Sequence, residues 1–362
     1  WQKSDANIPE LGQTWSQPKL ALVGTYPNPV LVMGGGYDTN EDIDPAPVGD
    51  TMGRAIVVLD AFSGASLWTA CPSGCTTAVA KMTYAIPSDV TLFDADGNGL
   101  TDRLYVGDLG GNIWRADISG DASSISGTVT QLASLGGTGT SARKFFFPPD
   151  VTPATGFDVV VATSGDREHP LLANASSTVI NRYYMLKDTN TTAGAPSSWA
   201  LITEAALLDN TAALTGGTPY PSTSTTQGFY ITFAKGEKAV NAPLNVAGYT
   251  RFGTNTPISN PNTCSANLGE ARGYAINFLT GAGLNDSGFV KFDGGGLPPS
   301  PVFALVAINP ATPTVLTPVL IGGGNQTGPG GGNNSSALGA NMVTPPNTGK
   351  RQRTYWYTED VK

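Results

Sequence analysis

The chain repeats a short unit in which a run of β-branched and aromatic residues, a turn rich in Asp or Gly, and a second such run follow one another. Residues 55–68 (AIVVLDAFSGASLW) and 103–117 (RLYVGDLGGNIWRAD) carry the full unit, and the second run of each contains a Trp. Residues 272–284 (RGYAINFLTGAGL) keep the strand and the Gly turn but lack the Trp. Such runs, joined by Gly turns, are typical of β-hairpins. Partial copies lie at 158–166 with 181–188, and at 317–325 with 353–358.

Hairpins repeated along a whole chain predict a β-propeller, because each blade is a small sheet whose faces need neighbours. A β-sandwich would explain the strands but not their recurrence. Gly (45) and Pro (27) make up about a fifth of the 362 residues, and charged residues only 13%, where about a quarter is usual. We therefore expect an all-β fold with at most one short helix, within 203–213. No tract marks a domain boundary, so we expect a single domain over 1–362. Its start at Trp1 without Met suggests an excised or processed fragment.

The charge of the chain limits its partners. The net charge is -8 and the isoelectric point is near 4.6. Nucleic acid binding needs a basic patch, so we expect no nucleic acid partner. Divalent cations are more natural partners of an acidic chain. No apolar run of eighteen residues occurs, so no transmembrane segment is expected.

The segment 94–102 (DADGNGLTD) has the spacing of a calcium loop. Acidic or amide side chains stand at its first, third, fifth and ninth positions, and Gly99 is sixth, where the chain must bend sharply. Calcium takes six to eight oxygen ligands at about 2.3–2.6 Å, and alternate residues of a tight turn direct their oxygens to one centre. The seventh residue can offer only its backbone carbonyl. The predicted Ca²⁺ ligands are Asp94, Asp96, Asn98, Leu100 through its carbonyl, and Asp102.

The loop departs from an EF-hand at its twelfth position, where Tyr105 replaces the bidentate Glu. Its flanks are not helical: 103–107 alternates as a strand, 110–112 is a hairpin turn, and 113–116 returns as a second strand. We therefore expect a shortened calcium loop between strands. The alternative is an Asx-rich turn held by its own hydrogen bonds with no metal. Three converging carboxylates would repel one another without a cation, which favours calcium.

The three cysteines are interpreted by their spacing. Cys71 and Cys75 are separated by three residues, and the single histidine, His169, is far along the chain. A zinc site is therefore implausible, and a local disulfide formed in an oxidising compartment is favoured. Cys264 is left over, either as a buried thiol or as a cysteine whose partner lies outside this chain.

Two further polar segments carry weaker signals. The acidic loop 37–50 contains Asp38, Glu41, Asp42 and Asp44; its irregular spacing favours a solvated surface loop over a second cation site. His169 lies among charged neighbours and is expected to be a hydrogen-bonded loop residue rather than a general base. No Gly-x-Ser-x-Gly elbow or phosphate-binding P-loop occurs, so we expect no catalytic residues and no enzyme.

Two other functions remain open alternatives. The unit LDAFSGASLW (59–68) also looks like the repeat of quinoprotein dehydrogenases, which are propellers with a quinone cofactor and calcium. Adjacent cysteines are absent, and a loop that coordinates calcium fully through protein oxygens leaves little room for a cofactor. The other alternative is a carbohydrate-binding propeller that uses Tyr355, Trp356 and Tyr357. Burial of these rings in a strand is the simpler interpretation.

Four phrases together resemble the C-terminal domain of the type IV pilus tip-associated adhesins and biogenesis proteins of the PilC/PilY family. The phrases are DADGNGLTDRLYVGDLGGNIWRAD (94–117), LGQTWSQP (11–18), ATSGDREHP (162–170) and ARGYAINFLTG (271–281). The resemblance covers essentially the whole chain, and the calcium loop followed by the Gly-Asp hairpin is its most specific part.

The resemblance implies a modified seven-bladed propeller with an EF-hand-like calcium loop. It also implies an extracellular location, at the bacterial pilus tip or the outer-membrane surface, and calcium-dependent control of pilus extension and retraction. Expected partners are minor pilins at the pilus tip and a host surface receptor or glycan. The family's ligand positions match this chain at the five loop residues predicted above. Calcium, strands and an oxidising compartment follow from the residues themselves, whereas pili follow from the resemblance alone.

Overall fold

The structure is a computed structural model. It describes residues 1–43, 49–192, 194, 196–258, 268–285, 287–307, 316–322 and 340–342. Within these residues the regular secondary structure is almost entirely β-strand. The helices there are five short 3-10 helices: η1 (Thr39–Asp42), η2 (Gly139–Ser141), η3 (Ala175–Thr178), η4 (Glu204–Ala206) and η5 (Thr211–Thr215). None of the described helices has the length and apolar character needed to cross a membrane.

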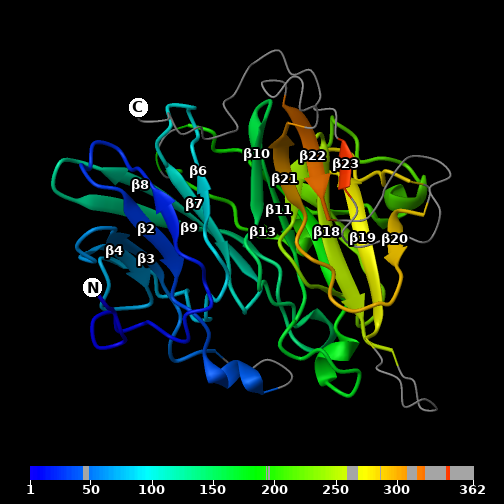
Figure 1. The fold of residues 1–362 in the computed structure, drawn as a ribbon, viewed down its shortest axis with the longest axis horizontal. Coiled ribbons are helices and arrows are strands. Elements are labelled where there is room, and N and C mark those ends of the chain that lie inside the picture. The colour runs from blue at the N-terminus through cyan, green and yellow to red at the C-terminus, as the bar shows by residue number, and fades with distance from the viewer. Residues whose placement is uncertain are drawn as a thin grey trace.

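The described strands form five sheets that follow one another along the chain, except that one short strand, Ile202–Thr203, joins the second sheet after the third has begun (Figure 1). Sheet 1 contains β1 (Lys19–Ala21), β2 (Val30–Gly34), β3 (Ile56–Asp60), β4 (Ser66–Cys71) and β5 (Thr77–Ala78). Sheet 2 contains β6 (Thr91–Phe93), β7 (Arg103–Gly107), β8 (Asn112–Gly120), β9 (Ile125–Ser134) and β13 (Ile202–Thr203). Sheet 3 contains β10 (Asp150–Ala154), β11 (Phe157–Thr163), β12 (Arg182–Asp188), β14 (Leu208–Asp209) and β15 (Gly228–Thr232).

Sheet 4 contains β16 (Lys238–Ala239), β17 (Leu244–Val246), β18 (Tyr249–Thr256), β19 (Glu270–Asn277) and β20 (Phe289–Phe292). Sheet 5 contains β21 (Val302–Val306), β22 (Thr317–Ile321) and β23 (Ala340–Met342). Most neighbouring strands are antiparallel, and short parallel pairings add β5, β13 and β14 at sheet edges. The all-β, propeller-like fold predicted from the sequence is confirmed. The described residues account for five sheets, so the number of seven blades stays a prediction.

Successive sheets pack face to face through apolar cores. Trp68 of sheet 1 and Trp114 of sheet 2 share one core. Sheets 2 and 3 share a second core, and sheets 3 and 4 share a third. In β12, Tyr184 lies in the second core and the adjacent Tyr183 lies in the third, because neighbouring side chains of a strand point to opposite faces. Burial of both faces explains why these strands are continuously apolar or aromatic.

The strands predicted from the repeated unit agree with the structure. The runs at 55–60 and 65–68 form β3 and β4, and the run at 103–107 forms β7. The expected helix within 203–213 is instead split: η4 and η5 flank the short strand β14, which pairs with β15. Because of this pairing, the middle of the segment 203–213 is an edge strand of sheet 3 instead of a helix. The Cys71–Cys75 disulfide predicted from the spacing is formed.

The acidic loop 37–50 was predicted to be solvated; that expectation is wrong for Asp38 and Glu41, whereas Asp42 is exposed. Glu41 is fully buried, and its carboxylate lies 2.7 Å from the ammonium of Lys144. Asp38 is also buried and caps η1 by accepting the Asn40 N–H at 3.0 Å. Glu41 can be buried because Lys144, about a hundred residues away in the chain, neutralises its charge. The local charge pattern does not predict this partner. Asp44, Cys264, Tyr355, Trp356 and Tyr357 lie outside the described residues.

Candidate metal centre

The segment 94–102 connects the edge strand β6 to β7 in sheet 2. Backbone hydrogen bonds close the base of the loop: the Asp102 N–H donates to the Phe93 carbonyl at 3.0 Å. Gly97 and Gly99 have φ of 78° and 88°, a left-handed conformation that glycine adopts without strain. The glycines therefore allow the tight winding that turns alternate side chains toward one side.

The loop brings three of the predicted ligands together. Asp94, Asp96 and Asp102 each offer a carboxylate oxygen, and these oxygens lie within 4.8 Å of one another. Asp94 and Asp102 are partly buried, whereas Asp96 is exposed. Oxygens at this separation can share one hard cation. The donor set, three carboxylates and no sulfur or imidazole, suits calcium rather than zinc or copper.

Backbone amides also support the three carboxylates. Asp94 accepts the N–H groups of Gly97 at 2.7 Å and Gly99 at 2.7 Å, and Asp102 Oδ2 accepts the Ala95 N–H at 2.9 Å. A carboxylate has about four acceptor sites, so these bonds leave lone pairs for a cation. The same bonds would hold an Asx turn without metal, which was the alternative considered from the sequence.

The other two predicted ligands are placed differently. The Asn98 amide donates from Nδ2 to Asp96 Oδ2 at 3.0 Å, and its Oδ1 accepts the Leu100 N–H at 2.7 Å. The Leu100 carbonyl accepts no hydrogen bond from the part of the chain that the structure describes, so it is available to a cation. Asn98 would have to turn its amide to present Oδ1. The five-residue ligand set stays a prediction.

The surroundings of Asp102 disfavour the charged form of its carboxyl group. The pKa of Asp102 is raised above its ordinary value, chiefly because burial penalises the charged carboxylate. The negative charges of Asp96 and Asp94 raise it further, whereas the hydrogen bond from Ala95 lowers it. A dication at this position would offset both effects by favouring the charged form.

The end of the loop is joined to both neighbouring sheets. The Thr101 N–H donates to the carbonyl of Leu22, just after β1 in sheet 1, at 2.7 Å. Two residues later, Arg103 Nη1 lies 2.6 Å from Asp158 Oδ2 on β11 of sheet 3. The metal loop therefore ends where three sheets meet.

A buried ionic network extends from Arg103, and sequence analysis missed it. Arg115 Nη2 lies 2.6 Å from Asp117 Oδ1, and its Nη1 lies 2.7 Å from Asp188 Oδ2. Tyr105, at the position where an EF-hand carries its bidentate Glu, donates to Asp188 at 2.8 Å. Asp158 and Asp188 stand at or beside strand ends, whereas Asp117 lies within β8, and all three belong to units predicted only as hairpins. Alternation of Arg and Asp along β8 was the available signal.

His169 has the structural role predicted for it. It is buried, and its Nδ1 lies 2.9 Å from Asp166 Oδ2, which also lies 3.1 Å from Lys144 Nζ. The pKa of His169 is raised, first by the hydrogen bond with Asp166. The ring is held between that carboxylate and the Asp42 carbonyl, 3.1 Å from Nε2.

Comparisons with known proteins identify relatives of this chain. No protein-family model matches it. It is 28% identical over 124 residues to a type IV pilus biogenesis factor PilY1 homolog of Xylella fastidiosa, and 28% identical over 123 residues to a second one from the same bacterium. These alignments cover 34% and 33% of this chain, and 8% of each relative's length.

A solved structure extends the likeness to most of the fold. The crystal structure of the Pseudomonas aeruginosa PilY1 C-terminal domain superimposes with a TM-score of 0.60, covering 88% of this chain and 73% of that domain at 17% sequence identity. The two sequence relatives confirm the family resemblance carried by the sequence phrases, and the superposition shows the shared fold. The chain is homologous to the PilY1 proteins and has the fold of the PilY1 C-terminal domain.

Proposed function

We propose that this chain is a non-enzymatic, calcium-binding module of a type IV pilus protein. It acts outside the cell, at the pilus tip or the outer-membrane surface, in pilus biogenesis and adhesion. The relatives named above are pilus biogenesis factors, which supports the pilus role. The Cys71–Cys75 disulfide fits an oxidising compartment. The observation that carries the calcium part is the convergence of Asp94, Asp96 and Asp102.

Asp94, Asp96 and Asp102 would hold the ion, with the Leu100 carbonyl and a rotated Asn98 amide completing the set. When bound, calcium supplies positive charge that offsets the repulsion among the carboxylates. Asp102 then anchors the entry to β7. Because Thr101 and Arg103 reach the two neighbouring sheets, ordering this entry stabilises the contacts among sheets 1, 2 and 3.

Calcium-dependent control of pilus extension and retraction follows if a pilus partner docks on the ordered loop and its neighbouring sheets. Minor pilins at the tip are the proposed partners inside the pilus, and a host surface receptor or glycan is the proposed partner outside it. The propeller provides a rigid scaffold whose connections carry recognition. No chemistry on a substrate is required for this role.

The calcium part is tested by isothermal titration of chelator-treated protein with calcium and, separately, with magnesium. We expect one calcium-selective site, and Asp102→Ala should weaken it by about tenfold or more, because a charged ligand is lost. Asp121→Ala is the matched control: Asp121 also forms an Asx turn, accepting the Ser123 and Ser124 N–H groups, but belongs to no carboxylate cluster among the described residues. Unchanged affinity in Asp102→Ala would remove this residue from the ligand set.

The pilus part needs a separate experiment in the producing bacterium. Deleting this region should reduce surface piliation or twitching, whereas Asp102→Ala should alter the response of twitching to calcium. Normal piliation and twitching in the deletion strain would contradict the proposed role.

A further inference from the structure

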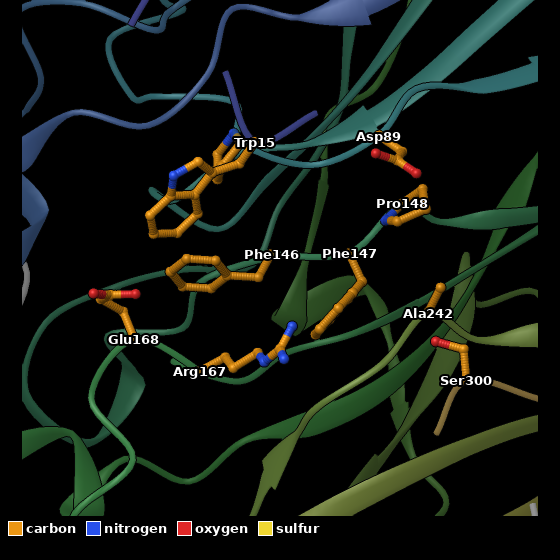
Figure 2. A pocket seen from close by; sticks show the side chains of 10 residues that line it. Trp15, Asp89, Phe146, Phe147, Pro148, Arg167, Glu168, Ala242 and Ser300 are labelled. Atoms are coloured by element: carbon orange, nitrogen blue, oxygen red, sulfur yellow. The ribbon is translucent and has the colours of Figure 1, made fainter. Parts of the chain in front are cut away.

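A cavity of about 490 Å³ lies where connections from several sheets meet (Figure 2). Its walls come from residues that precede β1 and β6, from the segment between η2 and β10, and from the loop after β11. The lining residues used below are Trp15, Asp89, Phe146, Phe147, Arg167 and Glu168. Its volume is within the range of about 300–1,000 Å³ that is usual for small-molecule sites.

One wall of the cavity is a preformed aromatic surface. The Trp15 indole stacks on the ring of Tyr37, with centroids 4.2 Å apart and an interplanar angle of 4°. Tyr37 is buried, whereas Trp15 remains 45% exposed. The ring centroids of Phe146 and Trp15 are 6.4 Å apart, and Figure 2 shows the two rings on the same side of the cavity. Stacking fixes the indole before any ligand arrives, which lowers the entropy lost on binding.

The polar groups of the cavity are nearly balanced in charge. Arg167 and Glu168 are both exposed, and neither forms an ion pair within the described residues. The Arg167 guanidinium lies 5.9 Å from the centre of the Phe147 ring. Asp89 is neutralised by Lys19, whose Nζ is 3.2 Å from its carboxylate. The cavity therefore offers hydrogen-bond donors and acceptors without a net charge that would favour an ionic ligand.

Buried hydrogen bonds and ion pairs fix the backbone on either side of Arg167 and Glu168. Arg167 and Glu168 lie between Asp166 and His169, which are joined at 2.9 Å. Lys144, 3.1 Å from Asp166, fixes the segment that carries Phe146 two residues later. Buried partners on both sides keep the positions of these groups defined, as a specific binding site requires.

We propose that this cavity binds a neutral sugar ring of a glycan. The C–H face of the ring packs on the Trp15 indole, and its hydroxyl groups bond to Arg167 and Glu168, which supply several donors and a carboxylate acceptor respectively. An extended peptide is usually recognised along an unpaired strand edge, and the aromatic and charged walls here are connections rather than strands. The proposal deepens the adhesion part of the proposed function by giving it a site and a ligand class. The site differs from the aromatic residues near 355–357 considered from the sequence.

The experiment is saturation-transfer NMR followed by titration of the whole chain with chitotriose, maltotriose, lactose and, as an acidic probe, sialyllactose. At least one neutral sugar should bind, with its ring protons receiving saturation. Trp15→Ala should weaken that binding by about tenfold, the loss expected for an aromatic stacking contact. Arg167→Met should weaken it several-fold. Phe62→Ala, which removes an exposed aromatic ring on the β3–β4 turn, should leave it unchanged.

Three results would overturn the proposal: no binding of any neutral sugar, binding that survives Trp15→Ala, or preference for sialyllactose. Binding of a proline-rich peptide that is lost in Trp15→Ala, with no sugar bound, would also overturn it. None of the loop residues 94–102 lines the cavity, so the two sites share no residue. Repeating the titration in chelator and with Asp102→Ala distinguishes failure of the sugar site from failure of the calcium site.

Discussion

Asp102 and Arg103 are adjacent in the chain, yet they bind different parts of the molecule. The Asp102 carboxylate accepts the Ala95 N–H at 2.9 Å within the metal loop, whereas the Arg103 guanidinium lies 2.6 Å from Asp158 on the next sheet. Arg103 is the first residue of β7 and is only 1% exposed. A change in the loop is therefore one peptide bond away from the contact between sheets 2 and 3.

Calcium should stabilise the protein against unfolding. Binding to the folded state alone contributes about 2.7 kcal/mol when free calcium is a hundred times its dissociation constant. We expect urea unfolding in calcium to require more denaturant than in chelator for the parent and for Asp121→Ala. In Asp102→Ala the difference should largely disappear. Equal calcium stabilisation in both variants would show that Asp102 is no ligand.

Asp102→Lys offers a sharper test of how the loop responds. The lysine ammonium would stand near the other two carboxylates and replace part of the positive charge of the metal. We expect this variant to be insensitive to calcium in the same unfolding assay, with a stability closer to that of the calcium-bound parent than to that of Asp102→Ala. A normal calcium response of Asp102→Lys would contradict this account.

Breaking the Arg103–Asp158 ion pair between sheets 2 and 3 should strongly destabilise the protein. Asp158→Ala leaves the buried Arg103 with Asp117 at 3.5 Å and the Thr192 carbonyl as partners. Removing one member of a buried pair destabilises by about 3–5 kcal/mol, and the remaining partners place this change near the lower end. The matched control is Lys291→Ala, which breaks an exposed pair with Glu270 and should change stability by about 1 kcal/mol or less. Equal effects in chemical denaturation would argue against the network.

The sequence predicted features that depend on near neighbours. The strands at 56–60 and 103–107 follow from local composition, and the loop at 94–102 follows from the spacing of its acids. Cys71 and Cys75 are four positions apart, so their disulfide could be predicted from the spacing alone. Each of these features is decided by backbone preference or short-range geometry, which a single sequence contains.

Features that depend on the order of the sheets could not be predicted in this way. Glu41 is buried because Lys144 reaches it from another connection. Arg103 and Asp158 are 55 residues apart. The strand β13 pairs with β9 of sheet 2, although it follows the first three strands of sheet 3 in the chain. The cavity beside Trp15 depends on connections from several sheets at once. Local patterns carry no information on which distant charge or ring will face a given residue.

The hairpin between β7 and β8 should depend on Gly111. Its φ is 79°, and a Cβ placed there would lie 2.4 Å from the Cα of Gly136. Gly111→Ala therefore combines an unfavourable backbone conformation, about 1–3 kcal/mol, with a clash against backbone that cannot move freely. Gly156→Ala is the control: its φ is 85°, but nothing lies within 4 Å of the added carbon. Thermal or urea unfolding should show the larger loss for Gly111→Ala; equal losses would rule out the clash.

His169 permits a direct titration because it is the only histidine in the chain. Its pKa should lie above the ordinary value of 6.5, mainly because Asp166 bonds to the protonated ring, and a single imidazole signal in NMR can report it. A raised pKa means that the folded state holds the proton more tightly than the unfolded state. The resulting stabilisation is fully present below about pH 6.5 and is lost as the pH rises through the folded-state pKa.

The difference in free energy of unfolding between the parent and His169→Gln should therefore shrink as the pH is raised from 6 toward 9. The midpoint of this decrease should lie at about the pKa read from the NMR titration. Taking the difference removes the contributions of other titrating groups, such as Glu41, whose pKa is raised by burial. Asp166→Asn should lower the His169 pKa, because the first cause of its rise is removed. An imidazole pKa below 6.5 in the parent, or one that does not fall in Asp166→Asn, would show that the Asp166 contact does not hold the proton on this ring.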